Sequence, residues 1–364
     1  MPRLAPQLIW RAHATSPHLV ALLPACRDLT SARNELRWIR EHVLSRCAGS
    51  SLEQRSLGDR RSRWTRSREG VEDEIAALCR RRGRGEPLQY VLGSQPFGDL
   101  EIRCRPGVLI PRPETEAWCY EAVGRIGRVL EREDGAAERG LRVLDLCSGS
   151  GCISLLLYAL LRQRLGDSGV QVTGLDIEPR AVKLARENLL LNTDRQGMQD
   201  ARGSIRFENA DVFCDGWIDS IAQEWTSSID VLVSNPPYIS SQGFERDTGR
   251  SVRNHEPRLA LVPELSLPFF PGRSPEDVFY ARLLEIADIL RPRTAVFEVG
   301  DLKQAMRVAE MGQRGYQGWE TIEIWRDWPD LTPASDEVDT TQVGQMEVPV
   351  KGSGHGRAVF FQRK

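Results

Sequence analysis

Residues 143–151 have the sequence Val-Leu-Asp-Leu-Cys-Ser-Gly-Ser-Gly, an apolar run that ends in a glycine-rich turn. Glycine suits such a turn because a side chain would keep a ligand away from the backbone. The turn lacks the Lys-Ser or Lys-Thr end of a phosphate-cradling loop. Asp145 lies just before it, where a carboxylate would repel a pyrophosphate and attract an ammonium group. The motif predicts a strand, a turn and a helix that bind a ligand with a cationic amino-acid tail, with Gly149 and Gly151 close to that ligand.

Apolar segments downstream of this motif alternate between strand-like and helix-like patterns. The strand-like segments are residues 142–146, 170–176, 204–208, 229–234, 295–299 and 358–362. The helix-like segments are residues 114–130, 152–165, 181–191 and 277–290. This alternation is typical of a parallel sheet with helices on both faces, so the sequence predicts an α/β fold.

Two further carboxylates follow strand-like segments. Asp176 ends the second of them, where an acid can accept hydrogen bonds from both hydroxyls of a ribose. Asp211 follows the third, where it can accept from an adenine amino group while Phe213 packs on the ring. Each acid taken alone is more often an ordinary strand-end or capping residue. Because the carboxyl ends of parallel strands meet at one edge of the sheet, Asp145, Asp176 and Asp211 together predict an S-adenosylmethionine site.

The fourth strand-like segment is followed by Asn235, Pro236, Pro237 and Tyr238. Two prolines exclude a helix and stiffen the turn, and they leave its carbonyl groups free to accept hydrogen bonds. The side-chain oxygen of Asn235 and the carbonyl of Pro236 can accept the two protons of an amide or amino-purine nitrogen, and Tyr238 can cover the planar group. The alternative is a proline-stiffened loop that has no catalytic role. We predict that this turn is the reaction site.

The Asn-Pro-Pro-Tyr turn resembles that of amino-group methyltransferases, which act on adenine N6, cytosine N4 or glutamine N5. Residues 85–93 and 109–116, with Phe97 between them, look like the connector of the PrmC/HemK family of release factor glutamine methyltransferases. Later blocks at Glu256, Phe279 and residues 297–300 fit the same family. The resemblance covers about residues 30–325 and the last strand.

This resemblance implies a Rossmann-like class I methyltransferase sheet preceded by a helical domain. It implies methyl transfer from S-adenosylmethionine to the side-chain amide nitrogen of the glutamine in the Gly-Gly-Gln motif of a class I release factor. It gives catalytic roles to Asn235, Pro236 and Tyr238. Substrate contacts are implied for these three residues and for Pro237, Phe97, Arg112 and Glu114. One departure is Val212, where the family usually has Trp, so the packing on an adenine ring there is open.

The chain divides into three predicted parts. Residues 1–85 predict a small helical domain that recognises the substrate, residues 86–116 a connector with a hairpin, and residues 117–364 the methyltransferase domain. Residues 332–356 are polar, and we expect a flexible insertion there; residues 50–70 form a second long insertion. Between Arg55 and Arg84, ten arginines face five acids. That charge indicates either a solvated helix face or a docking surface for a partner.

Composition narrows the function. The 49 basic and 51 acidic residues leave a net charge of −2, which removes the case for a generic nucleic-acid coat. No apolar run approaches the ~20 residues of a membrane helix. A DNA or RNA amino methyltransferase is the competing enzyme, but it would need a target-recognition domain or an extended basic surface. A non-catalytic scaffold would not need the Asn-Pro-Pro-Tyr turn. We expect a monomer that binds no metal, does not associate with a membrane and forms no stable complex with nucleic acid.

Two features bear on location. The eight cysteines lack paired or metal-ligand spacing, which indicates reduced thiols rather than a disulfide framework. No acid precedes Asp28, as in transit peptides and also in many soluble amphipathic N-termini. The resemblance implies that bacterial and mitochondrial members keep the helical domain. We therefore expect a mitochondrial enzyme, with the bacterial cytoplasm as the alternative.

Overall fold

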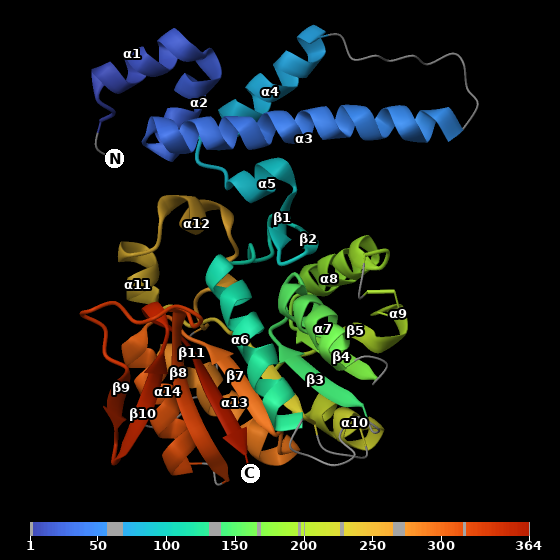
Figure 1. The fold of residues 1–364 in the computed structure, drawn as a ribbon, viewed down its shortest axis with the longest axis vertical. Coiled ribbons are helices and arrows are strands. Elements are labelled where there is room, and N and C mark those ends of the chain that lie inside the picture. The colour runs from blue at the N-terminus through green and yellow to red at the C-terminus, as the bar shows by residue number, and fades with distance from the viewer. Residues whose placement is uncertain are drawn as a thin grey trace. The chain divides into compact units, whose positions relative to one another are not determined.

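The computed structural model of the chain describes residues 3–56, 68–130, 140–165, 169–195, 198–199, 201–225, 229–264, 274–315 and 318–363 (Figure 1). The chain forms two compact units. The first consists of Met1–Ser94 together with Gly249–His255, and the second of Gln95–Thr248 and Glu256–Lys364. The chain thus leaves the second unit after Thr248, contributes a short helix to the first, and returns.

The first unit is helical, as the sequence predicts. Its helices are α1 (Pro6–Thr15), α2 (Pro17–Cys26), α3 (Leu29–Ser56), α4 (Arg68–Gly83), α5 (Leu88–Leu92) and α12 (Arg250–His255). Leu19, Ile39 and Ile75, from α2, α3 and α4, meet in one buried core. Arg82 on α4 donates two hydrogen bonds, of 2.7 and 3.0 Å, to the carboxylate of Glu35 on α3. These two side chains are only 15% and 12% exposed, so the ion pair helps to hold the two helices together.

The acid-free N-terminal stretch forms α1 and α2. Ser16 caps α2 by accepting a hydrogen bond from the His18 N–H at 3.3 Å, and Pro17 fits the first helical position because no N–H is needed there. Arg27 adopts a left-handed φ of 68° and ends the helix. Leu22 and Leu23 of α2 are fully buried. This stretch is therefore part of the core of the first unit, a role that its composition did not indicate.

In the described part of the second unit, nine strands form one sheet in the order β5-β4-β3-β6-β7-β11-β8-β10-β9. Its strands are β3 (Leu141–Leu146), β4 (Val170–Asp176), β5 (Ile205–Asn209), β6 (Val231–Ser234), β7 (Thr294–Glu298), β8 (Trp319–Trp328), β9 (Thr340–Val343), β10 (Met346–Lys351) and β11 (Ser353–Arg363). The strands from β5 to β7 are parallel, and β11 runs antiparallel to β7 and β8. The predicted α/β fold is confirmed. The strand order reverses between β3 and β6, which is where open α/β sheets bind ligands.

Helices cover both faces of the sheet, and each face has its own hydrophobic core. One face packs against α6 (Pro113–Leu130), α7 (Cys152–Leu165) and α8 (Pro179–Asn192). The other packs against α10 (Gly216–Glu224), α13 (Val278–Leu290) and α14 (Leu302–Gly315) (Figure 1). The remaining elements are a separate pair of strands, β1 (Ser94–Phe97) and β2 (Leu100–Arg103), and the short helices α9 (Ala201–Ser204), α11 (Ser241–Arg246), η1 (Arg258–Ala260) and η2 (Pro275–Asp277).

The segment 332–356 differs from the expected flexible insertion. It contains β9 and β10, which pair with each other, and β10 also pairs with β8. Val343, Val348 and Val350 bury their side chains in the core of one sheet face. Strands of only four and six residues give a weak alternation of apolar and polar residues. Because the surrounding residues are polar, the sequence did not indicate these strands. Much of the other predicted insertion, residues 57–67 of 50–70, lies outside the described residues.

The eight cysteines all lie among the described residues, and none of them forms a disulfide there. Among the described helices, none is both long and apolar enough to cross a membrane.

Candidate active site

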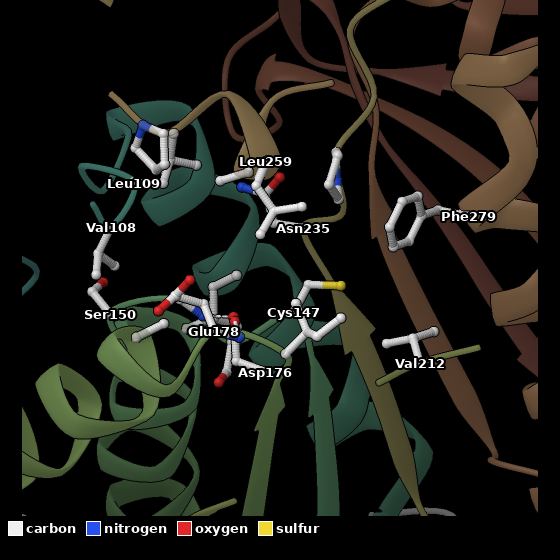
Figure 2. A pocket seen from close by; sticks show the side chains of 18 of the residues that line it. Val108, Leu109, Cys147, Ser150, Asp176, Glu178, Val212, Asn235, Leu259 and Phe279 are labelled. Atoms are coloured by element: carbon white, nitrogen blue, oxygen red, sulfur yellow. Dashed lines mark hydrogen bonds between the residues drawn. The ribbon is translucent and has the colours of Figure 1, made fainter. Parts of the chain in front are cut away.

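A cavity of about 380 Å³ lies at the carboxyl ends of the parallel strands of the second unit. Its walls include the segments that follow β3, β4, β5 and β6, the strands on either side of the reversal in strand order. Asp176, Asn235 and Phe279 approach the same space from three different elements (Figure 2). Cavities of roughly 300–1,000 Å³ are typical of small-molecule sites.

The glycine-rich turn between β3 and α7 forms one wall. Gly149 has φ 54°, and no atom lies within 4 Å of the position that a Cβ would take. A ligand can therefore approach its backbone closely. Gly151 has φ 78°, but a Cβ there would lie 2.8 Å from Phe207 Cζ and 2.9 Å from Ala185 Cβ. Gly151 does not line the cavity; the structure gives it a packing role between helix and sheet in place of the expected ligand contact.

Asp176 at the end of β4 lines the cavity, where the sequence predicts a ribose contact. One of its carboxylate oxygens accepts from the N–H of Gly149 at 2.8 Å, and the other from the N–H of Glu178 at 2.9 Å. Burial raises the pKa of Asp176, and the two backbone donors lower it. The carboxylate is thus held in place by the glycine turn that it faces, and lone pairs remain for a further donor.

Asp145 on β3 does not line the cavity, in contrast to its predicted contact with an ammonium group. The residue is 0% exposed. Its Oδ2 accepts from the hydroxyl of Ser154 on α7 at 2.6 Å, while Oδ1 has no partner among the described residues. Burial raises the pKa of Asp145 to about 7. In this structure Asp145 links β3 to α7 beneath the glycine turn.

The segment after β5 places both of its predicted residues on the cavity wall. Asp211 accepts from the N–H of Phe213 at 2.9 Å, which closes a tight turn. The ring of Phe213 packs edge-on against Phe279 of α13, with centroids 5.0 Å apart. Val212, where the resemblance left ring packing open, also lines the cavity. Phe279 lines the same cavity and therefore supplies an aromatic surface that the sequence analysis did not assign to the cofactor site.

The predicted reaction turn follows β6. Asn235 and Pro237 line the cavity, whereas Pro236 and Tyr238 do not. The Tyr238 hydroxyl donates to Glu298 at 3.2 Å, and its ring packs next to Gly300. The ring of Tyr238 is thus directed at the end of β7, which differs from its predicted place over a planar substrate group.

The connector contributes another wall through residues 107–112. Glu256 fixes this segment, because its carboxylate accepts from the N–H of Ile110 at 3.1 Å and from the Arg112 guanidinium at 2.7 Å. Arg112 and Leu259 both line the cavity. Figure 2 shows the side chain of Leu259 there. The structuring role of Glu256 was missed from the sequence, although its place in a block that fits the family was a visible signal.

Two residues with implied substrate contacts lie elsewhere. Phe97 is 0% exposed and belongs to the core of one sheet face, so in this structure it supports the fold. Glu114 is half-buried in the first turn of α6 and does not line the cavity. Among the described residues, no cluster of His, Cys, Asp and Glu has the arrangement of a metal site.

The donor and acceptor set of the cavity fits S-adenosylmethionine. The open backbone at Gly149 suits the close approach of a ligand, and the carboxylates of Asp176 and Asp211 suit hydroxyl and amino donors. Phe213, Val212 and Phe279 offer apolar surface for a flat ring. The cavity therefore has separate polar and apolar parts in the order that a nucleoside requires.

Comparison with known proteins agrees with this geometry. A family described as a methyltransferase domain matches residues 137–264. The mitochondrial MRF1 N(5)-glutamine methyltransferase MTQ1 of Saccharomyces cerevisiae is 32% identical over 306 residues, which cover 84% of this chain and 78% of the relative. The probable mitochondrial counterpart of Schizosaccharomyces pombe is 34% identical, with coverage of 85% and 89%. A release factor glutamine methyltransferase of Thermodesulfovibrio yellowstonii is 30% identical, with coverage of 70% and 76%.

Proposed function

The chain belongs to the family of release factor N(5)-glutamine methyltransferases, and on that premise we propose how its cavity acts on a glutamine side chain. The enzyme transfers a methyl group from S-adenosylmethionine to the side-chain amide nitrogen of the glutamine in the Gly-Gly-Gln motif of a class I release factor. The observation that carries this proposal is the place of Asn235. Its amide lies on the wall of the same cavity as Gly149 and Asp176.

An amide nitrogen is a poor nucleophile because its lone pair is delocalised into the carbonyl group. The side-chain oxygen of Asn235 accepts a hydrogen bond from one N–H group of the substrate amide. The second acceptor is the backbone carbonyl of Pro236, which does not itself line the cavity but lies between two residues that do, Asn235 and Pro237. These bonds shift electron density onto the nitrogen and fix its direction, so catalysis comes from polarisation and alignment. The methylated nitrogen then loses a proton to water, and this scheme needs no dedicated base.

Bound S-adenosylmethionine supplies an electrophilic methyl group on a positively charged sulfur. Asp176 would hold the ribose, Asp211 would accept from the adenine amino group, and the backbone at Gly149 would support the amino-acid tail, since all three residues line the cavity. The substrate glutamine enters beside Asn235, along the wall formed by the connector and Leu259. The packing of Asp145 beneath the turn supports an indirect role, in which it fixes the start of α7.

The helical unit recognises the release factor beyond the glutamine itself, because one side chain offers too few contacts for selectivity. Exposed arginines at the end of α4, Arg80 and Arg84, support this part of the proposal. The enzyme works in mitochondria, which is supported by the two yeast relatives named as mitochondrial. We also propose that it works as a monomer.

The test is a transfer assay with labelled S-adenosylmethionine. The substrates are a class I release factor, the same factor with its Gly-Gly-Gln glutamine changed to Ala, duplex DNA, and RNA. Label on the intact factor alone, mapped by fragment mass spectrometry to the glutamine side chain, is the expected result. Label on DNA or RNA and none on the release factor would contradict the proposal and favour a nucleic-acid methyltransferase.

A further inference from the structure

A buried carboxylate lies behind the reaction turn, at the end of β7. Glu298 is 1% exposed. Its Oε2 accepts from the Thr115 hydroxyl at 2.6 Å and from the Trp118 indole N–H at 2.8 Å, and its Oε1 accepts from the Tyr238 hydroxyl at 3.2 Å. The cluster joins α6, β7 and the turn after β6. No step of the mechanism described above uses it.

The chemistry of these partners fixes the direction of the hydrogen bonds. An indole N–H can only donate, so Oε2 of Glu298 must be an acceptor at 2.8 Å from Trp118. A threonine hydroxyl has one proton and two lone pairs. The short contact of 2.6 Å between Thr115 and the same oxygen therefore takes that proton. Any further neighbour of the Thr115 oxygen must act as a donor.

That further neighbour is Asn235. Its Nδ2 lies 3.5 Å from the Thr115 oxygen, a long hydrogen bond. Hydrogen bonds in catalytic sites without substrate are often long and tighten on binding. The two ends of an asparagine amide have almost the same shape, so their hydrogen-bond partners decide which end points where. With its NH2 toward Thr115, the amide presents its oxygen on the side away from Thr115.

We propose that Thr115 and Glu298 are positioning residues that orient the side chain of Asn235, so that its oxygen, and not its NH2, meets the substrate amide. This inference rests on the proposed function, because it assumes that Asn235 accepts a substrate N–H. In the reversed orientation the NH2 of Asn235 would face another NH2. Glu298 thus acts on the reaction through Thr115 and does not touch the reacting atoms. The same carboxylate holds the Tyr238 hydroxyl, so one acid orders both ends of the turn.

The test compares two substitutions of one side chain. Thr115→Val removes the hydroxyl and keeps the shape, whereas Thr115→Ser keeps the hydroxyl and removes only a methyl group. With Thr115→Val, the productive orientation of Asn235 leaves its NH2 without an acceptor. We expect kcat on the release factor to fall about tenfold to a hundredfold, the effect of one unsatisfied donor. Thr115→Ser should retain kcat within about threefold. Both variants should bind S-adenosylmethionine as the wild type does.

A double variant adds a readout that loss of folding would not produce. Once Asn235→Ala has removed the amide, its orientation has no further effect. Thr115→Val should then cost no more than about twofold in that background. Tyr280→Phe is the matched control for local packing, since the Tyr280 hydroxyl bonds to the backbone oxygen of Glu298 at 2.7 Å and leaves the carboxylate alone. Its kcat should stay within about twofold of the wild type.

Three outcomes would overturn the inference. These are an unchanged kcat for Thr115→Val, an equal loss in Thr115→Ser, or a loss of S-adenosylmethionine affinity as large as the loss of kcat. If Thr115→Val does not fold, Thr115→Ala makes the same comparison. The wild-type assay separates this inference from the proposed function. If the wild type does not methylate the release factor, the function fails, whereas a working wild type with an equally active Thr115→Val removes only the positioning role.

Discussion

The carboxylate of Asp176 accepts a hydrogen bond from the backbone N–H of Gly149 at 2.8 Å. The acid ends β4 and the glycine lies in the turn after β3, so this bond joins the ends of two neighbouring strands at the cavity. It holds the acid in place before a ligand arrives. A preorganised acceptor loses less conformational freedom on binding.

Replacement of Asp176 should therefore act on the cofactor and not on the chemistry. We expect Asp176→Ala to weaken S-adenosylmethionine binding by roughly 1.5–3 kcal/mol, since two hydroxyl donors lose a charged acceptor. Isothermal calorimetry measures the affinity. Asp176→Asn keeps the shape of the side chain without its charge, so its affinity for S-adenosylmethionine should lie between those of the wild type and Asp176→Ala. An unchanged affinity in Asp176→Ala would remove the ribose contact from this account.

Asp145 should make stability depend on pH. Burial raises its pKa to about 7 in the folded protein, against ~3.9 in an unfolded chain. Between these values the folded state binds more protons than the unfolded state, so this contribution favours folding at low pH and is lost as the pH rises toward 7. Relative to Asp145→Asn, the unfolding free energy of the wild type should fall by up to about 4 kcal/mol between pH 4 and pH 8. Urea unfolding at several pH values measures this difference. Parallel pH profiles of the two proteins would mean that Asp145 titrates normally.

The ion pair of Arg82 and Glu35 should support the helical unit. Arg82→Ser leaves a largely buried carboxylate without its partner, and we expect it to cost ~2 kcal/mol of stability. Arg84 is exposed and close in sequence, so Arg84→Ser is the matched control and should change stability by less than ~0.5 kcal/mol. Denaturant unfolding followed by circular dichroism compares the two. Equal losses would show that the pair has no special structural role.

Fewer arginines are available to the proposed docking surface than the sequence suggested. Arg81 pairs with Glu86 and Arg82 with Glu35, so these two arginines stabilise the fold. Part of the arginine-rich stretch from Arg55 to Arg84 lies outside the described residues. A double change of the exposed Arg80 and Arg84 to Ser should raise KM for an intact release factor, with an effect that weakens as salt rises.

Activity of the same double variant on a short Gly-Gly-Gln peptide should not change. A loss on both substrates, or on neither, would leave these arginines as a solvated helix face.

Much of this site could be predicted because its residues follow apolar strands. A strand that ends in Asp176 or Asn235 must deliver that residue to the edge of a parallel sheet, and the structure places both on one cavity. How deeply each side chain is buried, and which way it points, could not be predicted, because both depend on packing between segments far apart in the sequence. Asp145 bonds to Ser154 of α7, and Gly151 packs against Phe207 of β5. Tyr238 points toward Glu298.

Contacts between residues far apart in sequence were also out of reach. Glu256 and Arg112 meet across 144 positions, and Glu298 and Thr115 across 183. Neither acid belongs to a local motif with a fixed geometry. The strands β9 and β10 were missed for a related reason, since their pairing with each other and with β8 stabilises a segment whose own sequence is polar.

We propose above that Asn235 acts on the reacting amide and not on the cofactor. The most direct measurement is made on Asn235→Ala, with S-adenosylmethionine affinity from calorimetry beside the single-turnover rate of release factor methylation. We expect an affinity within about twofold of the wild type and a rate at least ~100-fold lower, the opposite of the pattern expected for Asp176→Ala. A loss of affinity equal to the loss of rate, or a rate close to that of the wild type, would contradict it.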